Sequence, residues 1–140
     1  MIAVYLYGDR AFIASEIGHR ALKWVVEPVS TVPIAKEAVS SALRETIEAA
    51  PFEGEAIDWS GLRKTSNPIF KASGARSQGT FQKKALPFHI YIDESGVDIE
   101  SWVPDVEYGF VRDEHWSERL PASATAEEIA DIILGHVSGR

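Results

Sequence analysis

The chain has 140 residues, of which 45% are hydrophobic, so it can bury one core but is short for two domains. Its formal net charge is −7, from 21 acidic and 14 basic residues, which makes free nucleic acid a poor partner for the whole molecule. The absence of cysteine excludes disulfides, thiol nucleophiles and thiolate metal sites, and it suits a reducing compartment. No apolar run approaches the roughly 18 residues of a membrane span, and MIAVYLYG lacks the basic stretch of a signal peptide. We therefore expect one cytoplasmic domain over residues 1–140.

The first elements alternate in the manner of a β-meander. Residues 2–7 place aliphatic side chains on one face and two tyrosines on the other, and Gly8 with Asp9 offers a two-residue turn into a second strand. A register that sets Val4 opposite Ile13 brings like faces together. The pattern predicts an antiparallel hairpin with one apolar face.

Prolines are expected to bound the next two elements. A third strand is predicted over 21–27, after a turn at residues 18–19, with Pro28 as its end. Apolar residues then recur at four-residue steps, which predicts a helix over 33–50. Ser30 or Thr31 is the expected N-cap of this helix.

Residues 51–87 carry weaker signals and are expected to be mostly irregular. They are rich in turn-forming residues, and IFKASG predicts at most a short helix that Gly74 would close. Regular alternation returns over 88–93 and 97–103, with DESG as the connecting loop. These two segments predict a second antiparallel hairpin.

The register of this second hairpin follows from its apolar residues. Pairing Ile92 with Val97 gathers the aliphatic side chains on one face, and it sets His89 opposite Glu100 and Tyr91 opposite Asp98 on the other. That other face is therefore expected to be a polar, aromatic outer face.

The chain is expected to end in a well-specified helix. After Pro104 the pattern predicts a loop and a short strand over 109–112, and Thr125 with Glu128 then forms a capping-box motif at the start of a helix over 125–138. The expected fold class is α+β: a single domain, mainly antiparallel β-sheet, with the helices 33–50 and 125–138 as two main helices packed on one face.

Motifs for most kinds of catalysis are missing. The chain has no G-x-S-x-G elbow, and GARSQG lacks the lysine and the spacing of a phosphate-binding loop. Its four histidines lie far apart in the sequence, without the spacing of a zinc site. We therefore expect no cofactor, no metal site and no enzymatic activity.

Acidic residues and aromatics dominate the segment from 93 to 118, which holds nine acids and one base. Like charges around a binding site accelerate encounter with an oppositely charged protein, and desolvated aromatics then hold it. The segment is interpreted as a docking surface for a basic protein, and the predicted contact residues are Asp98, Glu100, Trp102, Asp105, Glu107, Tyr108, Asp113 and Glu114.

Three other interpretations of these patterns stay open. The acidic face could be merely solubilising, with Trp102 and Trp116 packed in the core. Asp98 and Glu100 lie two apart on one strand face, which is compatible with the paired carboxylates of a small hydrolase. The basic block 61–84, where Phe70 and Phe81 interleave with cations, is compatible with a nucleic-acid-binding module.

A longer pattern covers about half of the chain. It consists of a small-residue turn, an S-x-x-x-F step, an alanine, a hairpin and a Gly-Phe-Val strand, preceded by a proline-led helix and followed by LPASATAEEIADIILGHV. In this sequence the parts are Ala72 to Ala75, Ser77 with Phe81, Ala85, residues 88–103, and Gly109 to Val111. The pattern resembles the central segment of immunity proteins from contact-dependent growth inhibition systems.

The resemblance implies a cytoplasmic protein that binds the C-terminal toxin domain of a cognate system and blocks it, often by covering a nuclease active site. Such toxin domains are frequently basic, because nucleases approach phosphates, so an acidic inhibitor has the right sign of charge. The implied complex is non-catalytic and 1:1, without direct binding of nucleic acid. Residues 97–116 are longer and more acidic than the family pattern, which makes them the leading candidate for recognising one particular toxin.

Overall fold

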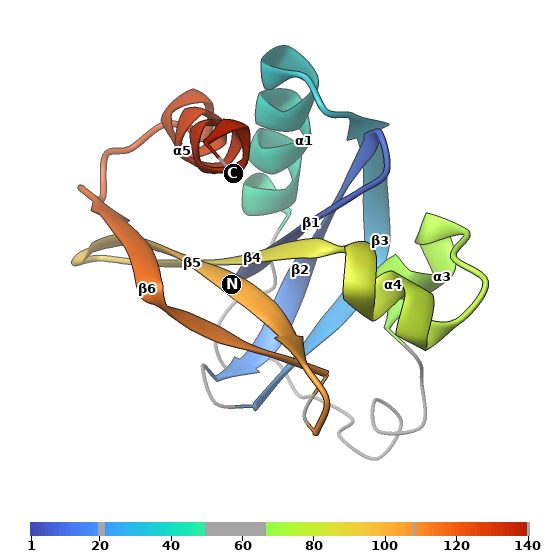
Figure 1. Ribbon diagram of the computed structural model, residues 1–140. Helices are drawn as coiled ribbons and strands as arrows, with labels where there is room; N and C mark the ends of the chain where they lie inside the picture. Colours follow the sequence, from blue (N-terminus) through green and yellow to red (C-terminus); the bar gives the residue numbers. More distant parts are fainter. Residues whose placement is uncertain (20–21, 50–66, 108, 140) are drawn as a thin grey trace.

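The computed structural model describes residues 1–19, 22–49, 67–107 and 109–139. They form an α+β fold in which helices flank one six-stranded antiparallel sheet of order β3-β2-β1-β4-β5-β6 (Figure 1). The strands are β1 (Ile2–Tyr7), β2 (Arg10–His19), β3 (Leu22–Pro33), β4 (Leu86–Asp93), β5 (Gly96–Asp105) and β6 (Gly109–Leu120). The helices are α1 (Lys36–Glu48), α3 (Pro68–Ser73), α4 (Gln78–Lys84) and α5 (Ala126–Ser138). No helix of the described residues is long and apolar enough to cross a membrane.

Both predicted hairpin registers are confirmed. Val4 lies opposite Ile13 in the β1–β2 pair, and Ile92 lies opposite Val97 in the β4–β5 pair. The two hairpins join through antiparallel pairing of β1 with β4, in which Val4 also lies opposite Phe88. Strand β1 is thus central, paired on both sides, and it makes one sheet of the two halves of the chain.

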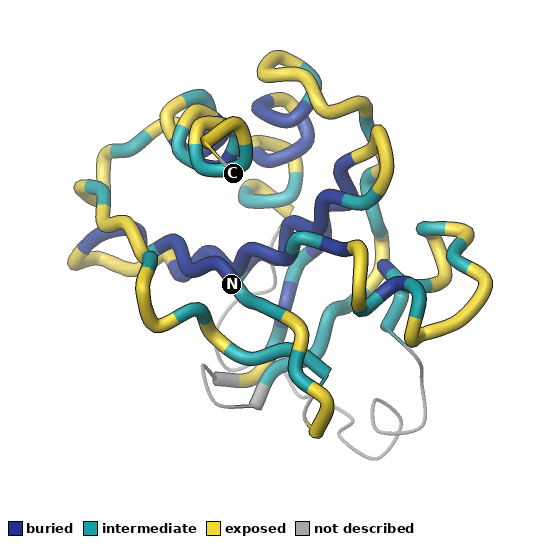
Figure 2. The backbone as a smooth tube through the Cα atoms, viewed as in Figure 1, coloured by how far each residue is buried: buried dark blue, intermediate teal, exposed yellow. Residues whose placement is uncertain are grey.

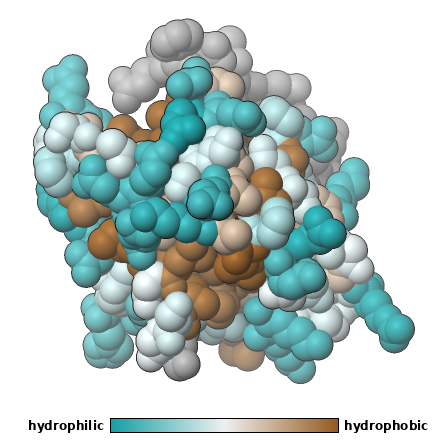
Figure 3. Space-filling model, turned by 90° about the horizontal axis from the view of Figure 1, so that it is seen from above, coloured by the Kyte–Doolittle hydropathy of each residue, from teal (hydrophilic) through white to brown (hydrophobic). Residues whose placement is uncertain are grey.

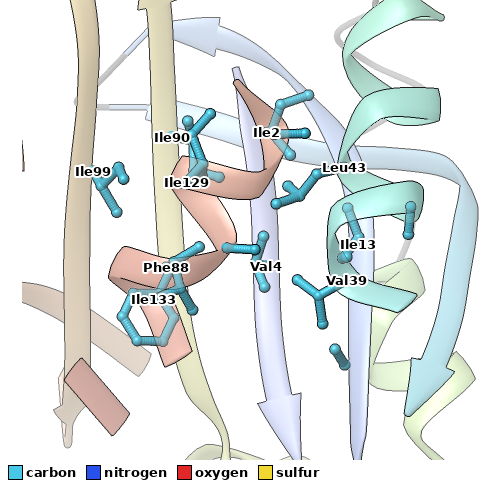
Figure 4. Close-up of a cluster of buried hydrophobic side chains, with 14 of the residues drawn as sticks. Ile2, Val4, Ile13, Val39, Leu43, Phe88, Ile90, Ile99, Ile129 and Ile133 are labelled. Atoms are coloured by element: carbon cyan, nitrogen blue, oxygen red, sulfur yellow. The ribbon is translucent and has the colours of Figure 1, made fainter. Parts of the chain in front are cut away.

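Helices α1 and α5 pack against each other on one face of the sheet, which confirms the prediction of two main helices on one face (Figure 1). Between them and the sheet lies the first core, whose side chains interlock in Figure 4. Its largest members are Ile2, Val4, Ile13, Val39, Leu43, Phe88, Ile90, Ile99, Ile129 and Ile133. Partly buried side chains, among them Trp116 and Val137, surround this core, and hydrophobic atoms show at the surface on this side (Figure 3).

Helix α5 begins as its motif predicts. The Thr125 hydroxyl accepts a hydrogen bond from the Glu128 backbone N–H at 3.2 Å, and Oε1 of Glu128 accepts one from the Thr125 backbone N–H at 3.3 Å. These contacts pair two amide donors that a helix N-terminus otherwise leaves without intrahelical partners.

The opposite face of the sheet carries a second, aromatic core. Helices α3 and α4 cover one end of it, and Phe81 from α4 stacks on Tyr5 from β1 with ring centroids 5.7 Å apart. The short helix α3 and its end at Gly74, where φ is 73°, agree with the sequence prediction. Helix α4 is additional to it: the Ser77 hydroxyl caps it by accepting a hydrogen bond from the Thr80 N–H.

Two boundaries at the β3–α1 connection were predicted wrongly. Strand β3 continues through Pro28 to Pro33, because β3 is the outermost strand and the register skips residues 27–29, so the missing proline N–H costs no ladder hydrogen bond. Helix α1 therefore starts at Lys36, and its N-cap is Ala35, which makes no side-chain hydrogen bond. Ser30 and Thr31 lie within the strand and cap nothing.

The last strand is also longer than predicted. Strand β6 runs for 12 residues instead of ending at Arg112. Its register against β5 jumps from Ser117 opposite Glu100 to Arg112 opposite Trp102, so residues 113–116 bulge out of the ladder. The bulge sends Trp116 toward the first core, where it stacks on His136 at 4.0 Å between ring centroids.

We predict that Leu43→Ala, which leaves a cavity on the buried face of α1, lowers the free energy of unfolding by about 2–5 kcal/mol. Chemical denaturation of the purified protein measures this loss. The control is Val106→Ala, at a fully exposed position, which should change stability by less than about 0.5 kcal/mol. Equal effects of the two substitutions would contradict the assigned core.

Candidate functional site

The residues predicted to bind a partner lie in three parts of the β5–β6 hairpin. Asp98, Glu100 and Trp102 share one face of β5, Asp105 and Glu107 lie at the turn, and Asp113 and Glu114 lie in the bulge of β6. Tyr108 lies outside the described residues. Figure 2 shows the contrast along the hairpin, from buried positions in the middle of β5 to exposed ones at the turn.

The face of β5 that carries Glu100 was predicted to be an outer face, and this prediction is wrong. Glu100 is only 5% exposed, and its cross-strand neighbour His89 is 4% exposed. The pairing of His89 with Glu100 is confirmed, but this face lies over the second core instead of facing solvent. Arg112 from β6 pairs with Glu100, with Nη1 3.4 Å from Oε2 of the carboxylate.

Curvature of the sheet explains the burial. Nζ of Lys23, on the edge strand β3, lies over the Trp102 ring on β5 at 4.0 Å from its centroid. Three strands separate β3 from β5 in the sheet, so this contact requires the sheet to curl toward this face. Trp102 in turn packs on His89, with ring centroids 4.8 Å apart. The cation–π contact with Lys23 and the packing on His89 therefore engage the half-buried Trp102 within the protein itself.

A buried acid that was not singled out from the sequence completes this cluster. Oε1 of Glu16, from β2, lies 2.7 Å from Nδ1 of His89, and both residues are 4% exposed. Glu16 reaches His89 across β1, where Ala3 lies beside His89 in the register and is small enough to leave room. An ionised carboxylate only accepts hydrogen bonds, so Nδ1 carries the proton of this contact when Glu16 is charged. The only sequence signal was an acid on the inward face of an alternating strand.

The Glu16–His89–Glu100 cluster has the character of an internal polar network. Its three ionisable side chains are covered, and no group of histidines and acids among the described residues could hold a metal ion. Among those residues the buried Nε1 of Trp102 has no hydrogen-bond partner. Tyr5 packs edge-on against His89, and burial raises the pKa of the Tyr5 phenol well above its ordinary value.

The acids of the hairpin differ in whether the protein itself neutralises them. Asp98 is paired with Arg119, whose Nη1 lies 2.6 Å from Oδ1, and the same guanidinium donates to the Ser95 carbonyl. Glu107 and Glu114, by contrast, are exposed and make no ion pair within the described residues. Of the predicted contact residues, these two exposed acids therefore lie at the turn and in the bulge of β6, away from the β5 face.

Helix α4 is hydrogen-bonded to both ends of the turn between β5 and β6. Nε2 of Gln82, from α4, donates to the backbone carbonyls of Asp105 at 2.6 Å and Gly109 at 2.5 Å. Oδ2 of Asp105 accepts from the Glu107 backbone N–H at 3.0 Å. In the bulge, Oδ1 of Asp113 likewise accepts from the His115 N–H at 2.9 Å. Asp105 and Asp113 thus stabilise the local backbone, at Glu107 and beside Glu114, with their own side chains.

The described part of the basic block lies on α3, on α4 and in the segment between them. Lys71, Arg76, Lys83 and Lys84 are exposed on or between α3 and α4, whereas residues 61–66 lie outside the described residues. Phe81 is buried in the second core and Phe70 packs against it. The aromatic pair that suggested stacking on nucleic-acid bases is therefore engaged in the fold.

Comparisons with known proteins give a fold and no function. No protein-family model matches the sequence, and no curated protein matches it. Among solved structures, a protein of unknown function from Neisseria meningitidis is similar with a TM-score of 0.68 at 12% sequence identity, over 99% of this chain and 94% of that one. At this level of identity the likeness shows that the two chains share a fold.

We predict that Glu16→Ala lowers the free energy of unfolding by about 1–3 kcal/mol, because it leaves the buried His89 ring without its hydrogen-bond partner. Urea denaturation at neutral pH measures the loss. Glu114→Ala is the matched control at an exposed acid, with an expected change of less than about 0.5 kcal/mol. A loss below about 1 kcal/mol for Glu16→Ala would show that the pair is not a structural contact.

The buried Tyr5 phenol leads to a second prediction, about protein stability at alkaline pH. Its pKa is raised in the folded state by burial first and then by the charge of Glu16. The stabilisation from its neutral phenol is present below the unfolded pKa of about 10 and declines as pH rises above that value. Tyr5→Phe should therefore flatten the loss of stability between about pH 10 and pH 11.5. An unchanged slope in urea titrations over this range would refute the burial of the Tyr5 hydroxyl.

Proposed function

We propose that this protein is an immunity protein that binds the toxin domain of a contact-dependent growth inhibition system and blocks it without catalysis. The observation that carries the proposal is the exposed acid at the β5–β6 turn and in the β6 bulge, where Glu107 and Glu114 have no ion-pair partner within the described residues. The sequence resemblance described above, which spans α3 to β6, supports the choice of family.

Electrostatics favours a basic protein as the partner. A nuclease domain must attract phosphates, so it presents clustered lysines and arginines around its active site. Acids on the rim of an opposing surface accelerate encounter with such a domain and disfavour neutral or acidic proteins. The net charge of −7 adds to this attraction at long range. The proposed mode is a 1:1 cytoplasmic complex that needs no cofactor and occludes the toxin's substrate site.

The proposed contact residues have two different roles, which depend on whether other residues of the protein already engage them. Glu107 and Glu114 would meet the toxin directly, together with Asp105 and Asp113 beside them. Asp98, Glu100 and Trp102 would act indirectly, because they contact Arg119, Arg112 and Lys23, respectively, of the protein itself. They hold the hairpin that presents the contact residues.

Co-expression tests the class of function. The toxin is expected to be the C-terminal domain of the protein encoded immediately upstream, and that domain alone should stop growth of a host cell. Growth should be restored when the present protein is expressed with it. A domain that is harmless alone, or toxicity that this protein does not relieve, would refute the immunity proposal.

Charge reversal tests the contact surface. Glu107→Lys with Glu114→Lys should lower the association rate with the purified upstream-encoded domain by about tenfold or more, and should weaken its dependence on salt. The control is Glu45→Lys with Glu48→Lys, which makes the same change of charge at exposed positions on α1, across the sheet. Surface plasmon resonance at two ionic strengths measures both. Equal effects of the two double variants would mean that net charge, and no particular surface, drives association.

A further inference from the structure

The tip of the β5–β6 hairpin exposes an aliphatic side chain completely. Val106 is fully exposed, whereas the other exposed large hydrophobic residues of the described chain, Ile34 and Ile92, are only 37% and 40% exposed. It stands between Asp105 and Glu107. A single exposed apolar residue is ordinary on a protein surface, so the argument rests on how this one is presented.

The tip is fixed to the centre of the protein. The two hydrogen bonds from Gln82 Nε2 hold both sides of the turn, to the Asp105 and Gly109 carbonyls. Gln82 follows Phe81, which is buried in the second core against Tyr5 and Phe110. Residues beside such fixed points lose less conformational entropy when they are bound, so the contacts of Val106 and Glu107 count more fully toward affinity.

The charges beside Val106 select the kind of partner. Glu107 is exposed and makes no ion pair within the described residues, and the whole molecule is acidic. An anionic lipid surface and a nucleic acid would both be repelled by it. A cationic cleft in a protein fits both features, because it takes a carboxylate at its charged wall and an aliphatic side chain at its floor.

We propose that this tip enters the cationic substrate cleft of the toxin domain, with Val106 as the apolar anchor and Glu107 in the place of a substrate phosphate. The inference rests on the proposed function and adds to it which element enters the cleft. Gln82 is a positioning residue in this arrangement, since it contacts only the hairpin backbone. The insertion makes binding of this protein and binding of the toxin's nucleic-acid substrate mutually exclusive.

Affinity measurements test the proposal with three variants. Val106→Arg, which sets a cation against the cationic cleft, should weaken binding to the purified upstream-encoded domain by about 100-fold or more. Val106→Ala should weaken it by about tenfold, and Gln82→Ala by a similar factor with faster amide exchange at the turn. Ile34→Arg is the control, at a partly exposed aliphatic residue before α1, and should leave affinity within about twofold. A thermal unfolding measurement on each of the four variants checks that it is folded.

The outcomes separate this inference from the function beneath it. If the wild-type protein fails to bind the upstream-encoded domain, the proposed function is refuted and the inference falls with it. If the wild-type protein binds but Val106→Arg binds equally well, the function stands and the tip is not the inserted element. A labelled oligonucleotide that stays bound to the toxin domain at saturating wild-type protein would also overturn the insertion.

Discussion

Pairing of β1 with β4 is the constraint on which the rest of the molecule depends. It joins the N-terminal meander to the later hairpin through residue pairs 80 to 88 positions apart in the sequence, and it lets Ile2, Val4 and Phe88 share one core under α1 and α5. On the other face it brings Glu16 from β2 within hydrogen-bond distance of His89 on β4. Without this pairing each half would expose an apolar sheet face and an unpaired strand edge.

The curvature of the joined sheet then determines which polar side chains of the β5–β6 hairpin are exposed. Lys23 closes over Trp102 from the far edge, so the middle of β5 turns inward with Glu100 and His89. The strands at both edges are irregular, β3 at residues 27–29 and β6 at residues 113–116. Irregular edges resist unwanted strand addition. The exposed acids Glu107 and Glu114 and the exposed Val106 lie outside this inward-turned part of the hairpin, at the turn and in the bulge of β6.

Sequence reasoning succeeded where local pattern decides the structure. Strict alternation specified the registers of both hairpins, and the Thr125 and Glu128 motif specified the start of α5. It failed where a distant strand decides. The edge position of β3 made Pro28 harmless, and no local signal carries that position. The burial of Glu100 likewise depends on the sheet curvature that Lys23 reports, and the role of Glu16 depends on β1 lying between two other strands.

Hydrogen–deuterium exchange on a complex with the upstream-encoded domain tests the central claim most directly, because it needs no substitution. The account predicts that binding protects the amides of residues 105–119, at the turn and along β6, and leaves α1 and α5 unchanged. Protection centred on the basic residues of α3 and α4, or on the α1–α5 face, would contradict it.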